Sequence, residues 1–416
     1  MRIRFALLLL LTGLFLPASS VLASDLVLIR AKIYPSPTEP PIENGSILIR
    51  NGHIQAVGPA AAIKVPHGAT VIDCKGLIVT AGFWNSHVYI LTPGLLNAET
   101  RSPEEINSQL KEIFTSWGFT TVFDIASVLQ NTNHIRLRIE SGEVDGPRIL
   151  TVGEPFWGKG GTPVYVRGFL EANHISIPEV ESTEQAAERV RQQIHDGADG
   201  IKIFANSVEQ DGILTMPLDL AKATVDEAHR AGKLVFAHVS NNQGIEVAIL
   251  SGADVLAHTT PADDLWSSSF AKRLTVAHLA LTPTLTLWDV EAKKSNPNAS
   301  PEAIEEGMGR AAQQLKAFSQ AGGQVLFGTD VGYIDTVNTS EEFEWMARAG
   351  MTVQQILASL TTNPAQRLGY SSRSGRIATG MDADLVVLSA DPAQRATAFS
   401  EVRYTIRAGK IIYSKK

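Results

Sequence analysis

Short runs of alternating apolar and polar residues, separated by turn residues, occupy the first part of the chain. Between residues 24 and 79 these runs cover residues 26–29, 45–50 and 53–57. Asn51 and Gly52 separate two of the runs, and this pair predicts a hairpin because both central residues of a type I′ turn need positive φ. The period-two alternation therefore predicts β-strands in residues 24–79.

The last part of the chain has the same pattern. Apolar runs cover residues 383–388, 402–406 and 411–413, and a turn at residues 408–410 separates the last two. Two β-rich ends that flank a long middle segment predict one small domain assembled from both. We therefore expect a β-sandwich whose first part is residues 24–79 and whose second part is residues 370–416.

The middle of the chain, residues 80–369, alternates apolar strands with amphipathic helices. Two of the helical patterns are residues 182–196 and 217–231, the second followed by Gly232 as a C-cap. The strand candidates are residues 77–83, 119–125, 148–152, 200–204, 234–237, 254–257, 280–284 and 324–328. This alternation is typical of a parallel sheet with crossover helices. Eight such strands predict the α/β class and a (β/α)8 TIM barrel.

Composition narrows the classes of function. The 416 residues include 36 basic and 43 acidic side chains, for a net charge of −7, and 44% are hydrophobic. These values are normal for a folded protein, and the acidic balance disfavours nucleic acids and anionic membranes as partners. Cys74 is the single cysteine, which excludes an internal disulfide and a cysteine-rich zinc site. Any metal must be held by other side chains.

The first 23 residues have the pattern of an export signal. Arg2 and Arg4 precede an apolar run at residues 5–16, and residues 21–23 provide a cleavage site. A membrane anchor is the alternative, but spanning a bilayer takes about 20 unbroken apolar residues. We expect cleavage after Ala23, export to a periplasm or secretion, and no membrane contact afterwards.

Polar side chains lie at or near the carboxyl ends of the predicted barrel strands, where barrel active sites are found. They are His87 after strand one, Lys202 in strand four, His238 after strand five, His258 after strand six and Asp330 after strand eight. Imidazole and carboxylate are common ligands of zinc, iron and manganese. An ammonium group beside divalent cations would be repelled, so Lys202 would have to be neutral or converted into an anion.

Seven short motifs, in a fixed order, carry a resemblance to a known family. They are residues 80–89 (TAGFWNSHVY), 200–203 (GIKI), 236–239 (FAHV), 255–259 (VLAHT), 327–330 (FGTD), 361–368 (TTNPAQRL) and 375–388 (GRIATGMDADLVVL). In these motifs the chain resembles the amidohydrolase superfamily, most closely its imidazolonepropionase-like and Xaa-Pro-dipeptidase-like branch. The resemblance extends over essentially the whole length after the export signal.

The resemblance implies a barrel with a β-sandwich built from both termini, and a centre for divalent metals, with zinc as the expected ion. It implies that carbon dioxide carbamylates Lys202 and that the carbamate bridges two metals. The first metal would then be held by His87, the carbamate and Asp330. The second would be held by the carbamate, His238 and His258.

One position departs from the family pattern. The motif after the first strand is normally His-x-His, whereas this chain has His87, Val88 and Tyr89. A neutral phenol is a poor ligand, and its ordinary pKa is about 10. Three outcomes are open: a metal pair with a loose first site, a single metal in the second site, or Tyr89 as a phenolate ligand.

These residues predict hydrolysis of a C–N bond in a small molecule. A metal-activated water would attack an amide or cyclic amide, and Asp330 would act first as general base and then as general acid. A dipeptide or an N-acyl amino acid is the expected kind of substrate. The alternative is a metal-poor barrel that serves as a binding or assembly subunit, which only Tyr89 favours. The oligomeric state is open, and a homo-oligomer is compatible with the sequence.

A glycine-rich segment, residues 158–163, follows the third predicted strand and is interpreted as a lid over the substrate. Trp157, Tyr165 and Arg167 flank this lid and are candidate substrate contacts, because loops after strands three and four shape specificity in the family it resembles. Arg167 could bind a substrate carboxylate with two hydrogen bonds, or it could be a solvated loop residue.

Overall fold

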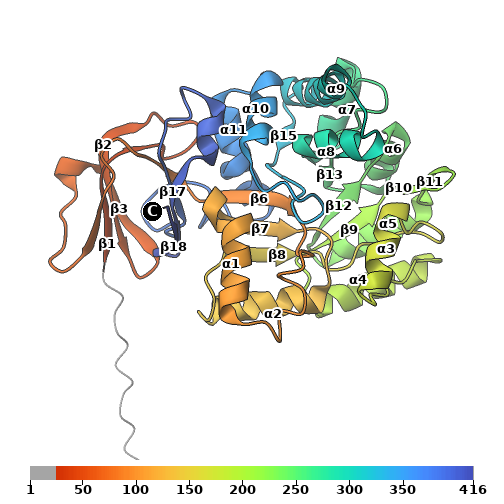
Figure 1. Ribbon diagram of the computed structural model, residues 1–416, viewed down its shortest axis with the longest axis horizontal. Helices are drawn as coiled ribbons and strands as arrows, with labels where there is room; N and C mark the ends of the chain where they lie inside the picture. The colour runs from red at the N-terminus through yellow and green to blue at the C-terminus, as the bar shows by residue number, and fades with distance from the viewer. Residues whose placement is uncertain (1–24, 416) are drawn as a thin grey trace, which may run out of the picture.

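The computed structural model describes residues 25–415, so the expected export signal, residues 1–23, lies outside the described residues. Strands from both ends of the chain lie together at one side of the molecule, and the middle of the chain forms a larger body beside them (Figure 1). None of the helices within residues 25–415 is long and apolar enough to cross a membrane.

The terminal strands form one mixed sheet of eight strands. Its order is β18-β17-β16-β5-β1-β2-β3, and β4 pairs with β1. The strands are β1 (Leu26–Ile33), β2 (Ile42–Arg50), β3 (His53–Pro59), β4 (Thr70–Asp73), β5 (Ile78–Ala81), β16 (Leu385–Leu388), β17 (Val402–Arg407) and β18 (Lys410–Ser414). The two ends of the chain meet where β5 pairs antiparallel with β16. Because all eight strands share one hydrogen-bonded sheet, the expected sandwich of two sheets is not confirmed.

The hairpin predicted at Asn51 and Gly52 is confirmed. Both residues have positive φ, 50° and 78°, and they connect β2 to β3. The antiparallel register places Arg50 opposite His53, next to the turn.

Eight parallel strands form the body. They belong to two sheets with the orders β6-β7-β8 and β15-β14-β13-β12-β9. The strands are β6 (Phe83–Val88), β7 (Phe119–Asp124), β8 (Arg148–Thr151), β9 (Gly200–Phe204), β12 (Leu234–His238), β13 (Val255–Ala257), β14 (Ala280–Thr282) and β15 (Gln324–Val325). Isolated parallel bridges join the sheets, between Phe156 and Ile203 at one junction and between Val88 and Val331 at the other. The arrangement is a TIM-barrel-like α/β fold.

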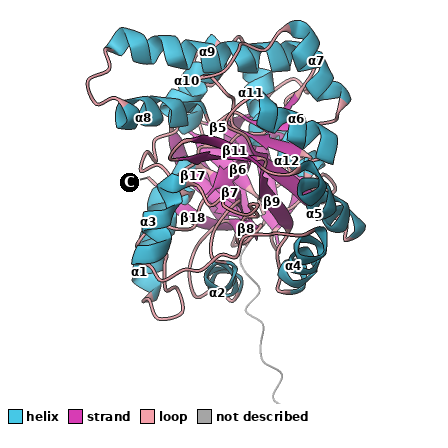
Figure 2. Ribbon diagram, turned by 90° about the vertical axis from the view of Figure 1, so that its right-hand side faces the viewer, coloured by secondary structure: helices cyan, strands magenta, loops and turns pink. Residues whose placement is uncertain are grey.

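Helices surround these strands (Figure 2). They are α1 (Pro103–Ile113), α2 (Leu129–Glu140), α3 (Val164–Ala172), α4 (Thr183–His195), α5 (Leu218–Arg230), α6 (Asn242–Ser251), α7 (Ser268–Val276), α8 (Leu285–Ser295), α9 (Pro301–Gln320), α10 (Ser340–Arg348), α11 (Val353–Leu360) and α12 (Thr362–Arg367). The helices predicted at residues 182–196 and 217–231 are α4 and α5. Ser182 caps α4 by accepting a hydrogen bond from the Gln185 amide, 3.2 Å away. A small hairpin, β10 (Asn206–Glu209) and β11 (Gly212–Thr215), lies outside the barrel strands.

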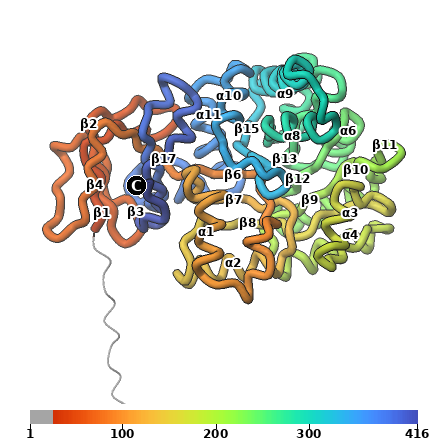
Figure 3. The backbone as a smooth tube through the Cα atoms, in the orientation of Figure 1, coloured from red at the N-terminus to blue at the C-terminus, as the bar shows by residue number. Residues whose placement is uncertain are grey.

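The first predicted strand, residues 77–83, is wrong in its bounds. The chain forms β5 in the terminal sheet and then β6 in the body, and Figure 3 traces this passage. Gly82 separates the two strands, and a Cβ there would lie 2.2 Å from Thr120 Oγ1. One apolar run therefore serves two sheets with different partners. His87 consequently lies within β6 instead of following it.

Strands β6, β7 and β9 are buried at every position. Strands of a parallel sheet covered on both faces have this burial, and they appear in the sequence as continuous apolar runs. Lys202 interrupts such a run in β9, and His87 follows two other buried polar residues in β6; Lys202 and His87 are each 0% exposed. A buried charge or imidazole needs a partner, so these two positions mark the interior where chemistry can occur.

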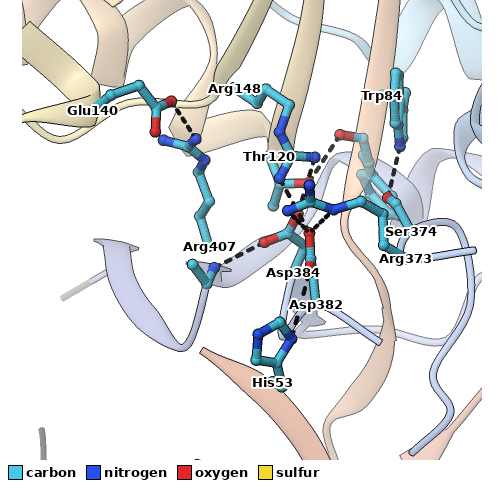
Figure 4. A network of polar contacts seen from close by, with 12 residues as sticks. His53, Trp84, Thr120, Glu140, Arg148, Arg373, Ser374, Asp382, Asp384 and Arg407 are labelled. Carbon is cyan, nitrogen blue, oxygen red and sulfur yellow. Dashed lines mark hydrogen bonds and ion pairs between the residues drawn. The ribbon is translucent and has the colours of Figure 1, made fainter. Parts of the chain in front are cut away.

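A polar network ties the terminal sheet to the body (Figure 4). Asp382, just before β16, accepts hydrogen bonds from Arg373 Nε at 2.8 Å and from Arg148 Nη2 at 3.1 Å. Arg148 is the first residue of β8. Asp384 accepts a hydrogen bond from the Ala408 amide at 2.8 Å, and its carboxylate lies 3.9 Å from Arg148. One arginine of the barrel is thus held by two carboxylates of the terminal segment.

Replacing Asp382 with alanine should lower the free energy of unfolding by about 2 kcal/mol, because a mostly buried Arg148 loses a charged partner. Urea unfolding followed by circular dichroism measures the change. The control is Glu188→Ala, which removes the exposed Glu188–Arg191 pair and should cost less than about 0.5 kcal/mol. Equal effects of the two substitutions would show that the Asp382 network does not stabilise the fold.

Candidate active site

Four of the predicted ligands converge at the carboxyl ends of the barrel strands. His87 Nε2 lies 2.7 Å from Asp330 Oδ1. The ring centroids of His87 and His258 are 4.6 Å apart, and those of His258 and His238 are 5.1 Å apart. These side chains come from β6, β12 and the segments after β13 and β15, so the parallel strand ends bring together residues distant in the sequence.

Close backbone packing shapes this region. Gly332 has a φ of 98°, and a Cβ there would lie 2.0 Å from the Tyr89 carbonyl oxygen. His258 and Asp330 also have positive φ, 79° and 66°, which is uncommon for residues with a Cβ. Such backbone strain concentrates at functional sites, where the surrounding structure enforces it.

Two threonines orient the imidazole rings. Thr282 Oγ1 lies 3.1 Å from His87 Nδ1, and Thr284 Oγ1 lies 2.7 Å from His258 Nδ1. A partner on Nδ1 directs Nε2 of each ring toward a common centre, as is usual for metal-binding histidines. Sequence reasoning missed both threonines. Their position in the carboxyl-terminal half of the seventh predicted strand, residues 280–284, is the feature that would have found them.

Tyr89 lies between two of the predicted ligands. Its hydroxyl accepts a hydrogen bond from Lys202 Nζ at 2.8 Å and lies 3.3 Å from His87 Nε2. Burial raises the pKa of Tyr89 well above its ordinary value. The phenol therefore stays protonated in the protein alone, and the residue that replaces the second histidine of the motif occupies the space beside Lys202.

Burial also sets the charges of the other groups. It lowers the pKa of Lys202 to about 7, although the charges of Asp330 and Asp124 act in the opposite direction. It lowers the pKa values of His87, His238 and His258 well below the ordinary value, so these imidazoles are neutral. Burial raises the pKa of Asp330. Neutral imidazole is the form that binds metals.

The donor set fits a divalent cation. Ligand atoms of His87, His258 and Asp330 all lie within 4.8 Å of one another, and all three residues are buried. Within residues 25–415, Asp330 Oδ1 has no hydrogen-bond partner despite its proximity to His87 Nε2. A buried carboxylate oxygen without a donor, facing two imidazoles, is what a metal site offers before the metal binds. Lys202 and His238 border this set, Lys202 through Tyr89 and His238 through its contact with the His258 ring.

A cavity of about 800 Å³ opens onto this centre. Tyr89, His238, His258 and Asp330 form its polar end. Large apolar and aromatic side chains, from segments distant in the sequence, form most of the remaining wall, among them Trp157, Tyr165, Phe169, Phe204, Trp288 and Tyr333. A concave apolar cavity with a few convergent polar groups is typical of small-molecule sites.

The model of the amidohydrolase family matches residues 78–412. The chain belongs to the amidohydrolase family. Among curated relatives, ochratoxinase from Aspergillus niger is 22% identical over 411 aligned residues, which cover 89% of this chain and 83% of that protein. Imidazolonepropionase from Thermoplasma acidophilum is 24% identical over 391 residues, which cover 90% of each.

A solved structure of a Xaa-Pro dipeptidase with bound methionine superposes with a TM-score of 0.79 at 22% identity, covering 94% of this chain and 100% of that one. The superfamily predicted from the motifs is confirmed by the family match, and the two named members of the predicted branch are among the proteins to which this chain is similar. This amidohydrolase is a hydrolase acting on C–N bonds.

Two of the three predicted substrate contacts lie at the cavity, and the third, Arg167, does not. Trp157 and Tyr165 line the cavity of the amidohydrolase. Arg167 is not among the lining residues, and its guanidinium contacts the Glu209 carboxylate and donates to the Thr162 carbonyl at 3.0 Å. In this structure Arg167 pairs with Glu209, so its role as a clamp for a substrate carboxylate stays a prediction. This pairing joins α3 to β10, and sequence periodicity cannot reveal it.

Glu342 in α10 anchors helix α8, which forms part of the cavity wall. Its carboxylate accepts hydrogen bonds from the amides of Leu285 and Thr286, each at 2.8 Å, and from Thr286 Oγ1 at 3.1 Å. Thr284, the N-cap residue, provides no side-chain cap, so Glu342 satisfies the first amides of α8. The helix that carries Trp288 is thereby fixed next to Thr284, the partner of His258.

Stability should depend on pH through Glu342. Burial raises the pKa of Glu342 from 4.5 to about 7, so between these values the folded state binds a proton that the unfolded state releases. The contribution is fully present below about pH 4.5 and is lost as the pH rises through about 7. The wild type should therefore lose about 2 kcal/mol relative to Glu342→Gln between roughly pH 5 and 7. Urea unfolding of both proteins across this range measures the difference; parallel pH profiles would contradict it.

Proposed function

We propose that this amidohydrolase uses a bound divalent metal, with zinc as the expected ion, to hydrolyse an amide or cyclic amide of a small molecule. The observation that carries the proposal is the convergence of His87, His258 and Asp330 at the polar end of the cavity, with one carboxylate oxygen of Asp330 lacking a donor. When bound, the metal lowers the pKa of a water molecule and polarises the scissile carbonyl.

Asp330 acts on protons at both stages of the reaction. As a carboxylate it takes the proton of the attacking water, and as an acid it returns this proton to the leaving nitrogen. Burial raises the pKa of Asp330, which favours the return of the proton. Thr282 and Thr284 hold the His87 and His258 rings, and the His87 ring in turn lies 2.7 Å from Asp330 Oδ1, which helps to fix the position of this carboxylate.

Lys202 is proposed to be carbamylated and to act as a metal ligand together with His87, His238 and His258. Its pKa of about 7 leaves a substantial fraction of neutral amine. A neutral amine attacks carbon dioxide and releases one proton, which gives an anionic carbamate. Carbamylation would convert the Lys202 ammonium group, which otherwise faces Tyr89, into an anionic metal ligand. Either one or two metal ions would then bind.

A metal-poor binding or assembly subunit is the second candidate. The observation that favours it is the hydrogen bond between Lys202 Nζ and Tyr89 Oη, which holds the lysine as an amine. Retention of His87, His238, His258 and Asp330 around one centre favours the hydrolase. We further propose that the substrate is a small molecule. Residues 1–23 are proposed to direct export to a periplasm or secretion. A homo-oligomer is compatible with the hydrolase and with the binding subunit.

Metal content per chain tests the proposal directly. The protein is purified with zinc and bicarbonate present, and elemental mass spectrometry gives the number of ions. About two ions per chain would support a metal pair, and about one would support a single-metal hydrolase. The metal-loaded protein is then tested against N-acyl amino acids, dipeptides and neutral amides. A metal content near zero together with no hydrolysis would favour the binding subunit.

A further inference from the structure

Helix α3 turns an apolar face toward the cavity. The residues of this α3 face all line the cavity, and their spacing places them on one side of the helix: Tyr165, Val166, Phe169 and Leu170. The apolar face of a surface helix normally packs into the core, yet no residue of α3 is buried. The α3 face therefore borders open cavity instead of packed side chains.

The β10–β11 hairpin adds a second apolar wall. Val208 pairs with Ile213 across the hairpin, so both side chains lie on the same face of the two strands, the hairpin face. Both line the cavity, although 36% of Val208 and 45% of Ile213 are exposed. Leu214, the next residue, lies on the opposite face because side chains alternate along a strand, and it is not among the lining residues. The hairpin thus presents accessible aliphatic surface to the cavity.

An ion pair fixes the two walls next to each other. Arg167 in α3 contacts the carboxylate of Glu209, the residue after Val208 in β10. Helix α3 and the hairpin accordingly lie side by side in Figure 1. Neither Arg167 nor Glu209 is among the residues that line the cavity, so the pair joins the walls from outside it.

The two walls are continuous with the candidate metal centre. Measured between ring centroids, Tyr165 at the start of α3 lies 5.5 Å from Tyr333, and Tyr333 lies 6.4 Å from Tyr89. The Tyr89 hydroxyl contacts Lys202 and lies 3.3 Å from His87 Nε2. A molecule bound at the metal centre can therefore extend past these three rings to the α3 face and the hairpin face.

The kind of side chain changes along this path. Aromatic rings lie at the centre, where Phe204 stacks on His238 and Trp288 lies 6.2 Å from His258, centroid to centroid. Most of the lining side chains from α3, the segment after it and the hairpin are aliphatic: Val166, Leu170, Ile175, Ile177, Val208 and Ile213. Accessible apolar surface of this extent marks a binding site, and because it continues the cavity wall, its occupant is the molecule bound at the centre.

We propose that the substrate carries a long linear aliphatic chain on one side of the scissile C–N bond, and that this chain lies against the α3 face and the hairpin face. This inference rests on the proposed function and names the apolar part of its substrate. In the reaction, water gives its hydroxyl group to the acyl carbon and a proton to the leaving nitrogen as the C–N bond breaks, whichever side carries the chain.

A series of linear methyl ketones tests the proposal in the wild-type protein, purified with zinc and bicarbonate present. These ketones keep the carbonyl group of an amide but have no C–N bond, so they bind without being hydrolysed. Their chains run from propyl to heptyl. Isothermal titration calorimetry should show the affinity rising about threefold for each added methylene group, because each one is removed from water. An affinity that does not depend on chain length would overturn the proposal.

Two neighbouring residues of the hairpin provide matched variants. Ile213→Ser removes a cavity-lining side chain and should weaken binding of the heptyl ketone about tenfold, while the affinity for the propyl ketone stays unchanged. Leu214→Ser is the control, because it removes a side chain of similar exposure, 41% against 45%, from the opposite face of the hairpin. It should leave both affinities unchanged. Equal losses in the two variants, or no loss in Ile213→Ser, would contradict the assignment of the chain to the hairpin face.

The same variants test whether a second copy of this chain covers the two walls instead. Sedimentation velocity gives the oligomeric state of the wild type and of both variants, and circular dichroism confirms that they are folded. Neither substitution should change the oligomeric state. Dissociation of an oligomer by Ile213→Ser would assign the hairpin face to a subunit interface and overturn the proposal.

Hydrolysis separates this inference from the proposed function. Octanoyl and acetyl p-nitroanilide place the chain on the acyl side, and N-octylacetamide and N-ethylacetamide place it on the amine side. A kcat/KM at least about tenfold higher for one long-chain member than for its short-chain partner would support both proposals. Cleavage without this preference would contradict the inference and keep the hydrolase. Binding of the ketones that depends on chain length, without cleavage of any of these amides, would contradict the hydrolase and keep the inference.

Discussion

Replacement of Asp330 with asparagine should reduce turnover by about 10²–10⁴-fold. The amide has the size of the carboxylate but cannot take a proton from water, so the base is lost while the shape of the site is kept. Asp330 Oδ1 lies 2.7 Å from His87 Nε2, so the substitution removes a negative charge next to a proposed metal ligand. The fold should stay intact, and most of the bound metal should remain.

Turnover is measured under saturating substrate for the wild type and the variant, and metal content is measured on the same samples. Asp226→Asn on the outer helix α5 is the matched control, because its half-exposed carboxylate is paired with exposed Lys222. It should leave turnover and metal content at the wild-type level. Undiminished activity of the Asp330 variant would remove this residue from the proposed proton transfers.

Replacement of Tyr89 with histidine should raise the affinity for the more weakly bound zinc ion by about 10–100-fold. Histidine restores the second imidazole of the family motif next to His87 and removes the hydroxyl that Lys202 contacts at 2.8 Å. Because histidine is smaller than tyrosine, the buried space accepts it without a clash. Both changes favour an additional ligand at the first metal position.

Titration with a zinc chelator and elemental mass spectrometry measure the affinity and the number of ions per chain. Tyr89→Phe is the control, since it also removes the hydroxyl but offers no ligand atom, and its zinc affinity should not rise. An unchanged number of ions and unchanged affinity in Tyr89→His would show that Tyr89 does not limit the first site.

Much of the site could be predicted from the sequence because parallel strands bring their carboxyl ends to one place. His238, His258 and Asp330 each follow a recognisable apolar strand, and this regularity alone predicts that they meet. The strand predicted at residues 200–204 has the observed bounds. The relative positions of such strand ends follow from the topology and do not depend on details of side-chain packing.

Other features depend on contacts between segments that no local pattern connects. Considered by itself, Arg167 could be solvated or a clamp, and only the three-dimensional structure shows that it pairs with Glu209. The threonines that orient His87 and His258 were not weighted because a threonine at a strand end is common. The apolar run at residues 77–83 predicts one strand, because the break at Gly82 results from the close approach of Thr120 in β7, which no local pattern reveals.

The pairing of β5 with β16 has a consequence for the order in which this chain can fold. Strand β5 is synthesised early, whereas its neighbour β16 is synthesised after the entire barrel segment. One edge of β5 therefore stays unpaired while about 300 residues are added. Unpaired sheet edges are templates for aggregation. Versions of the protein cut short before Leu385 would leave this edge open, whereas a rearranged chain that begins with β16 would close it from the start.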